Sequence, residues 1–308
     1  MIRIASTHFV EDWIDIQLTN FEKYIKEPYL VYTRMPDDPT QTGKSTASGG
    51  IIPDPIYEKH KHKFYKAIPG ASRIAETTRV VLNEISKDLK DDDLVILMDA
   101  DCFPISKNFI SKLKTKLKSA DLAIAIEPEH EWYLERMPHP FFVAFKGKTL
   151  FKKDSKGNSL FVCLSTRKEK KGNWWGLLMD WCNDNQWSSL ERTNKNNISL
   201  IYFGVYENIF YHHWAGSRII KTRTDRRRVA KTGEDIDKVA NENKLNSLKI
   251  IKEIKEDQNS FIKKLTNSLS MKISLIQPGR NNLKYLKWSY DSIRKNQGDH
   301  EVEICVAD

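Results

Sequence analysis

The fold is decided by residues 94–101, which read LVILMDAD. Five consecutive apolar residues are typical of a strand that is buried on both faces of a largely parallel sheet. Two aspartates, Asp99 and Asp101, stand directly at the carboxyl end of this strand. Because open α/β sheets bind their ligands at the carboxyl ends of their strands, this position predicts a functional site.

The chemistry of the two aspartates suits a hard divalent cation, Mn²⁺ or Mg²⁺, which in turn holds the oxygens of a diphosphate. Such a cation neutralises the charge that develops on a departing nucleoside diphosphate. The alternative is that Asp99 and Asp101 only cap the turn before Pro104, since an Asp-x-Asp pattern occurs often by chance. The strand that leads into the pattern favours the cation site.

Strands and helices alternate on both sides of this stretch. Residues 2–6 are a predicted strand, and apolar residues at helical spacing follow it up to Pro28. The proline- and glycine-rich residues 33–56 predict a long loop that flanks the site. The sequence therefore predicts an α/β domain with a sheet flanked by helices. Its further elements are a helix after Ser72, a helix through 109–117, and strands at 122–126 and 141–145.

The bulk composition narrows the function classes. The chain has 308 residues and no apolar run near the roughly 20 residues that a membrane span needs. Its start lacks the features of an export signal, and its four cysteines are scattered, so we expect a cytoplasmic protein with reduced thiols. The formal net charge of +9 favours anionic partners: nucleoside diphosphates, lipid headgroups or nucleic acid.

A second candidate cluster is residues 211–218, which read YHHWAGSR. One imidazole could complete a metal site, but neighbours in an extended segment point to opposite sides, so only one of His212 and His213 can face it. A buried histidine of the core is the alternative role. Gly216 permits close approach of the backbone to a phosphate, and Arg218 could pair with that phosphate.

With both clusters present, residues 1–220 resemble glycosyltransferases of the GT-A fold. The resemblance implies a Rossmann-type mixed sheet that binds a nucleotide sugar. It further implies that Asp99 lies near the ribose and the metal, that Asp101 is the principal metal ligand, and that His213 is a later ligand. We expect the nucleotide sugar to be contacted by Asp99, Gly216, Ser217 and Arg218.

No residue carries an obvious signature of the catalytic base that an inverting transfer requires. Three glutamates follow the predicted strand at 122–126, namely Glu127, Glu129 and Glu131. Asp180 is a further candidate. Glu129 and Asp180 are the predicted catalytic residues. A solvated surface position is the alternative for all four, and the stereochemistry of transfer stays open.

The composition of the sequence changes after Arg223. Residues 223–243 are highly charged, and apolar residues then recur at helical spacing from Leu245 to Leu265, which predicts a helical connector. Residues 271–308 form a new strand-helix-strand unit that resembles the start of a family 2 glycosyltransferase domain. It carries QPGRNN at 277–282 and ends on Asp308, which matches the aspartate that contacts the nucleotide base in that family.

The sequence thus predicts a catalytic domain at 1–222, a charged helical connector at 223–270 and the truncated start of a second glycosyltransferase-like domain at 271–308. The predicted function is metal-dependent transfer of a sugar from a nucleoside-diphosphate sugar to a glycan, lipid or protein acceptor. Contact with a membrane surface is left open.

Two other functions account for part of the sequence. A sugar-phosphate nucleotidyltransferase normally has a glycine-rich loop after its first strand, whereas residues 4–9 contain no glycine. A non-catalytic, basic nucleic-acid-binding protein would account for the arginines at 226–228 but leaves the strand-end carboxylates unexplained. We therefore expect no specific nucleic acid partner.

Overall fold

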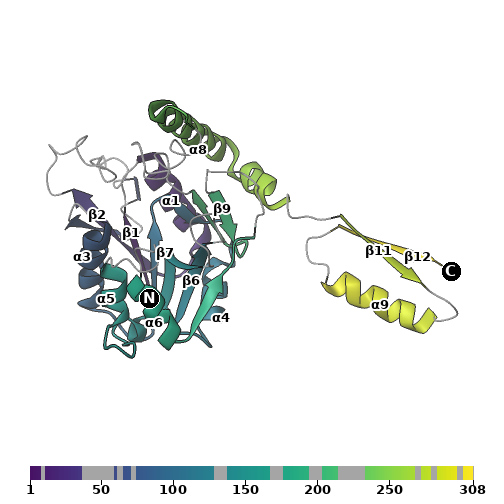
Figure 1. Cartoon of the computed structure of the whole chain (residues 1–308), viewed down its shortest axis with the longest axis horizontal. Coiled ribbons are helices and arrows are strands. Elements are labelled where there is room, and N and C mark those ends of the chain that lie inside the picture. Colours follow the sequence, from purple (N-terminus) through teal and green to yellow (C-terminus); the bar gives the residue numbers. More distant parts are fainter. Residues whose placement is uncertain are drawn as a thin grey trace.

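The computed structural model describes residues 1–7, 11–36, 59–60, 65–70, 74–127, 137–166, 176–193, 203–213, 233–267, 272–278, 283–296 and 301–307. The predicted class is confirmed, because these residues form an α/β structure with a mixed sheet flanked by helices (Figure 1). Among the helices of this described part, none is long and apolar enough to cross a membrane.

The main sheet has seven strands in the order β3-β2-β1-β4-β7-β6-β8. Strand β7 runs antiparallel to both of its neighbours, and all other pairs are parallel. The predicted strand at 94–98 is β4, which lies in the middle of the sheet. The strands are β1 (Ile2–Thr7), β2 (Tyr29–Pro36), β3 (Tyr65–Gly70), β4 (Leu94–Asp99), β6 (Leu122–Glu127), β7 (Met137–Lys146) and β8 (Trp187–Leu190).

Helices cover both faces of the sheet, which explains the unbroken apolar run of β4. On one face Ile96 and Met98 pack with α1 (Glu11–Tyr24) and α4 (Phe109–Lys116). On the other face Val95 and Leu97 pack with α3 (Ile74–Ser86), α5 (Leu160–Ser165) and α6 (Gly176–Asp184). Because successive side chains of a strand alternate between faces, a strand covered on both sides must be apolar at every position. A short 3-10 helix, η3 (Gly147–Thr149), follows β7.

A smaller antiparallel sheet adjoins the end of β4. Its strands are β5 (Cys102–Pro104), β10 (Phe210–His213) and β9 (Phe203–Tyr206), in the order β5-β10-β9. Only two residues separate β4 from β5, so the polypeptide passes from the main sheet into the small sheet through Ala100 and Asp101. The small sheet therefore brings β10, from late in the domain, beside the candidate site.

The predicted connector helix is α8 (Ile236–Asn267), which is kinked at Asp257, and its residues from Ile251 onward pack on the domain. Ile251, Ile254 and Phe261 are buried in a cluster with residues of α1 and of the small sheet. Leu245 and Leu248 have the same helical spacing but are 65% and 46% exposed. Among the side chains of α8 that the structure describes, the buried apolar ones therefore run from Ile251 to Leu265.

The strand-helix-strand unit expected near the end of the sequence is present as β11 (Lys272–Pro278), α9 (Leu283–Asn296) and β12 (Glu301–Ala307). Strands β11 and β12 pair in parallel as a separate two-stranded sheet. Figure 1 shows this unit apart from the main sheet, beyond α8. The division of the chain into domains at residues 222 and 270 stays a prediction.

A buried ion pair joins β1 to the start of β4 at the end of the sheet away from Asp99. The Nε of Arg3 donates to Oδ2 of Asp93 at 2.7 Å, and each side chain is 3% exposed. Arg3 also donates to the Tyr32 hydroxyl and to Asp88. This pair connects β1 and β4 at one end of the sheet, and the candidate site lies at the other end of the same two strands.

Candidate metal-binding site

The candidate site lies where the sheet changes its direction of winding. From β1 the chain passes through α1 to β2 on one side, and it later passes through α3 to β4 on the other side of β1. The helices α1 and α3 cover opposite faces. Ligands of open α/β sheets bind at such a switch point, outside the carboxyl ends of the two diverging strands. Thr7 pairs with Asp99 at this end of β1 and β4.

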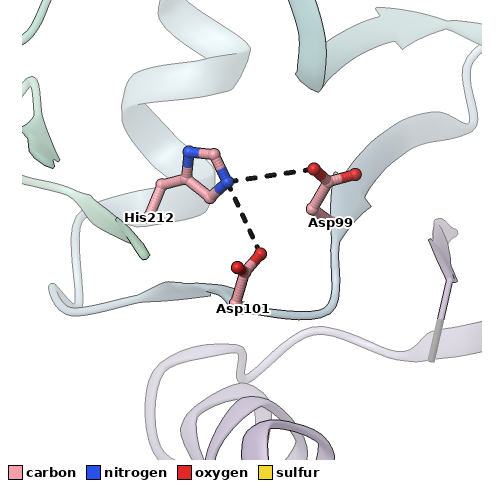
Figure 2. A group of neighbouring side chains, drawn as sticks. All are labelled: Asp99, Asp101 and His212. Carbon is pink, nitrogen blue, oxygen red and sulfur yellow. Dashed lines mark ion pairs between the residues drawn. The ribbon is translucent and has the colours of Figure 1, made fainter. Parts of the chain in front are cut away.

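Strand β10 places a histidine beside the two aspartates. The Nε2 atom of His212 lies 3.5 Å from Oδ1 of Asp101 and 3.8 Å from Oδ2 of Asp99 (Figure 2). The ligand atoms of all three residues lie within 4.8 Å of one another. Residues more than 100 positions apart in the sequence therefore converge on one small volume at the end of β4.

The alternation of side chains along β10 determines which histidine reaches the aspartates. Phe210 packs in the cluster on the α1 and α4 side of the main sheet, and His212 stacks on Phe141 of the same cluster. Tyr211 packs with Trp13 in the separate cluster that includes residues of α8. The ring of His213 stacks on Trp13 at 4.7 Å. Neighbouring residues of a strand point to opposite faces, so the two histidines are separated.

The structure thus puts His212, and not the expected His213, beside the two carboxylates. The Nδ1 atom of His213 lies 3.0 Å from the Tyr211 hydroxyl, and its backbone N–H donates to the carbonyl of Asp101 at 2.9 Å. Burial lowers the pKa of His213 to about 4, so its imidazole is neutral at pH 7. Its ring has the surroundings of a core histidine, which was the alternative role.

The three grouped side chains differ in their access to solvent. Asp101 and His212 are each 3% exposed, whereas Asp99 is 47% exposed. His212 is held from behind by Phe141 of β7, whose ring lies 4.1 Å away and nearly parallel. Two of the three side chains are therefore fixed in the protein interior, while the third lies at the surface.

The donor set fits a divalent cation. Carboxylate oxygens suit Mg²⁺ and Mn²⁺, and one imidazole nitrogen is compatible with a transition metal such as Mn²⁺. The neighbouring Cys102 is buried, and its burial together with the charges of Asp101 and Asp99 raises the pKa of its thiol well above the usual value.

Asp180 is placed far from this group. Its carboxylate accepts from Nζ of Lys156 at 2.8 Å. The indole N–H of the adjacent Trp181 donates to the carbonyl of Lys152. Lys152 comes shortly after Gly147, whose N–H donates to the carbonyl of Asp93, the residue just before β4. These contacts put Asp180 near the amino end of β4, whereas the cluster lies at its carboxyl end. The structure therefore does not bring Asp180 to the candidate site.

The other predicted site residues, Glu129, Gly216, Ser217 and Arg218, lie outside the described residues. Their roles as catalytic base and as nucleotide-sugar contacts stay predictions. Asp308, expected to match a base-contacting aspartate, also lies outside them.

No protein-family model matches the sequence, and no curated protein matches it. Among solved structures, a 4-diphosphocytidyl-2C-methyl-D-erythritol synthase has 12% identity and a TM-score of 0.41 over 65% of this chain and 92% of its own. A putative glucose-1-phosphate thymidylyltransferase from Bacillus anthracis has 7% identity and a TM-score of 0.37 over 67% and 89%. The galactosyltransferase LgtC, in complex with donor and acceptor sugar analogs, has 10% identity and a TM-score of 0.37 over 62% and 73%. The likeness is weak at these values.

Proposed function

We propose that the chain is a metal-dependent glycosyltransferase that moves a sugar from a nucleoside-diphosphate sugar to a glycan-type acceptor. The observation that supports this most strongly is the convergence of Asp99, Asp101 and His212, with ligand atoms within 4.8 Å of one another, at the end of β4. This is also the switch point of the sheet, where nucleotides bind in open α/β folds.

The charges in the group favour a bound cation. Two carboxylates held this close repel each other unless a positive charge lies between them, and a cation removes that cost. When bound, Mn²⁺ or Mg²⁺ supplies Lewis-acid stabilisation of a leaving diphosphate. Asp101 and His212 exclude water from the protein side of the group, since each is 3% exposed.

The exposed ligand, Asp99, is where we expect the donor to arrive. Its side chain is about half exposed and stands at the last paired position of β4, opposite Thr7 of β1. The proposal gives Asp99 contact with both the cation and the nucleotide sugar, and Asp101 with the cation alone. Gly216, Ser217 and Arg218 stay proposed as contacts to the nucleotide sugar, and Glu129 as the base that removes the proton of the acceptor.

The decisive experiment incubates the chain with Mn²⁺ and a panel of nucleotide sugars and measures release of nucleoside diphosphate. Asp101→Asn should abolish this release at Mn²⁺ concentrations that saturate the wild type. Loss of a direct ligand should cost more than the roughly 10- to 100-fold in metal affinity that loss of an outer partner costs. Asp92→Asn is the matched control, because Asp92 is exposed in the turn before the same strand.

Two results would contradict the proposal. One is that no nucleotide sugar yields nucleoside diphosphate with either cation. The other is that Asp101→Asn releases it as fast as Asp92→Asn. A parallel incubation with nucleoside triphosphates and sugar phosphates tests the rival reaction, since a nucleotidyltransferase would release pyrophosphate instead.

A further inference from the structure

We propose that Gln17 of α1 is a positioning residue that fixes the turn carrying Asp99 and Asp101. The inference rests on the proposed cation site, whose geometry this turn sets. Gln17 is fully buried, although it is a polar residue on the face of α1 that packs on the main sheet. A buried primary amide needs partners for its oxygen and its two N–H groups.

The amide of Gln17 spans the whole Asp-Ala-Asp segment. Its Nε2 donates to the carbonyl of Asp99 at 2.8 Å and to the carbonyl of Cys102 at 2.6 Å. These two carbonyls bracket Ala100 and Asp101. Both can only accept hydrogen bonds, so the nitrogen of the amide must be the atom that faces them.

The pairing of β5 with β10 explains why the carbonyl of Cys102 is free for this contact. The N–H of His213 donates to the carbonyl of Asp101, which makes these two residues a hydrogen-bonded pair of the antiparallel ladder. Such pairs alternate along a ladder with pairs whose polar groups point outward. Cys102 is opposite His212 in the next pair, so its carbonyl points away from β10, off the edge of the small sheet.

A third hydrogen bond fixes the amide itself. The hydroxyl of Ser6 on β1 donates to Oε1 of Gln17 at 2.8 Å. The side chain of Gln17 thus connects β1, the end of β4 and the start of β5. With both ends of the turn held, the backbone positions from which Asp99 and Asp101 project are set before any ligand arrives. Metal sites depend on such outer contacts to orient their ligands.

The test uses the full chain and compares Gln17→Met with Asn20→Leu. Methionine matches the length of glutamine but cannot donate to the two carbonyls. Asn20 is a matched control: it lies three residues further along α1, is 1% exposed, and its amide exchanges hydrogen bonds with Gln258 of α8. Either substitution removes a buried amide, but only the first releases the turn.

Two quantities are measured on each variant. The first is the hydrogen-exchange rate of the His213 amide without metal, which reports local opening at Asp101. The second is the Kd for Mn²⁺, from calorimetric titration with the metal alone. We expect Gln17→Met to speed this exchange and to weaken Mn²⁺ binding roughly 10- to 100-fold. Asn20→Leu should leave both quantities at wild-type values, whatever its effect on the unfolding midpoint.

The proposal is overturned if Gln17→Met keeps the wild-type exchange rate and Mn²⁺ affinity, or if Asn20→Leu changes both by the same amount. If the wild-type chain does not bind Mn²⁺, the proposed function fails, and the exchange rate alone decides the role of Gln17: a faster rate supports it and an unchanged rate overturns it. If Gln17→Met does not fold, Ser6→Ala replaces it. That variant removes the bond that orients the amide, and unchanged values there also overturn the proposal.

Discussion

Replacing Asp93 with asparagine tests whether the ion pair with Arg3 holds the two central strands together. The substitution keeps the shape of the side chain but removes the charge that the buried Arg3 guanidinium faces at 2.7 Å. Breaking a buried pair by removing one partner costs about 3–5 kcal/mol, because the other charge is left uncompensated. Arg3 keeps its contacts to Asp88 and Tyr32, so we expect the lower end, about 3 kcal/mol.

The assay is thermal and urea unfolding of the full chain. A loss of about 3 kcal/mol should lower the melting temperature by about 6–12 °C, at 2–4 °C per kcal/mol for a domain of this size. Asp88→Asn is the control, because Asp88 contacts the same guanidinium from a side chain that is 68% exposed. An exposed ion pair contributes about 1 kcal/mol or less. If both variants lower the melting temperature equally, burial does not govern this pair and the reasoning is wrong.

The remaining predictions concern acid stability and the choice of histidine. Burial alone would raise the pKa of Asp93, but hydrogen bonds from the amino terminus, the Lys90 amide and Arg3 outweigh it, so the pKa is lowered. Its contribution to stability is therefore complete above the unfolded-state pKa of about 3.9 and is lost as the pH falls through the folded-state pKa. The stability difference between wild type and Asp93→Asn should stay constant from about pH 7 to 5 and shrink below about pH 4 in urea titrations; a difference that grows on acidification would contradict this. At the candidate site, His212→Asn should weaken calorimetric Mn²⁺ binding more than about 10-fold, whereas His213→Asn should lower the unfolding midpoint and leave the Mn²⁺ affinity close to wild type. The reverse order would restore His213 as the ligand.

The central strand and its two aspartates could be predicted from the sequence because burial on both faces leaves a distinct signature. The unbroken apolar run at 94–98 has that signature, and the change to polar residues at Asp99 marks where the strand ends. The direction of β7 could not be predicted in the same way. An apolar strand looks the same whether it runs parallel or antiparallel to its neighbours, so the sequence indicated a strand at 141–145 but not its antiparallel place beside β4.

The choice between His212 and His213 was beyond the sequence for a related reason. A strand with one solvent-exposed face shows which residues point inward, because its polar and apolar side chains alternate. In β10 all four residues are buried, and both Phe210 and Tyr211 are large aromatic residues that pack in separate clusters. The sequence therefore does not show which residues of β10 point toward the aspartates. The pairing of β10 with β5 determines this, and the pairing is seen only in the structure.

Gln17 is a different case, because the sequence did carry a signal for it. Apolar residues of the first helix, among them Ile14, Leu18 and Phe21, define its buried face, and Gln17 lies three residues after Ile14 and four before Phe21, on that same face. A polar residue among buried positions must find hydrogen-bond partners inside the protein, since an unsatisfied amide is costly there. The helix comes after β1 and packs against β4, and the structure shows that the Gln17 amide meets the turn at the end of β4. The helical spacing thus indicated that Gln17 is buried and needs partners, whereas the identity of those partners required the fold.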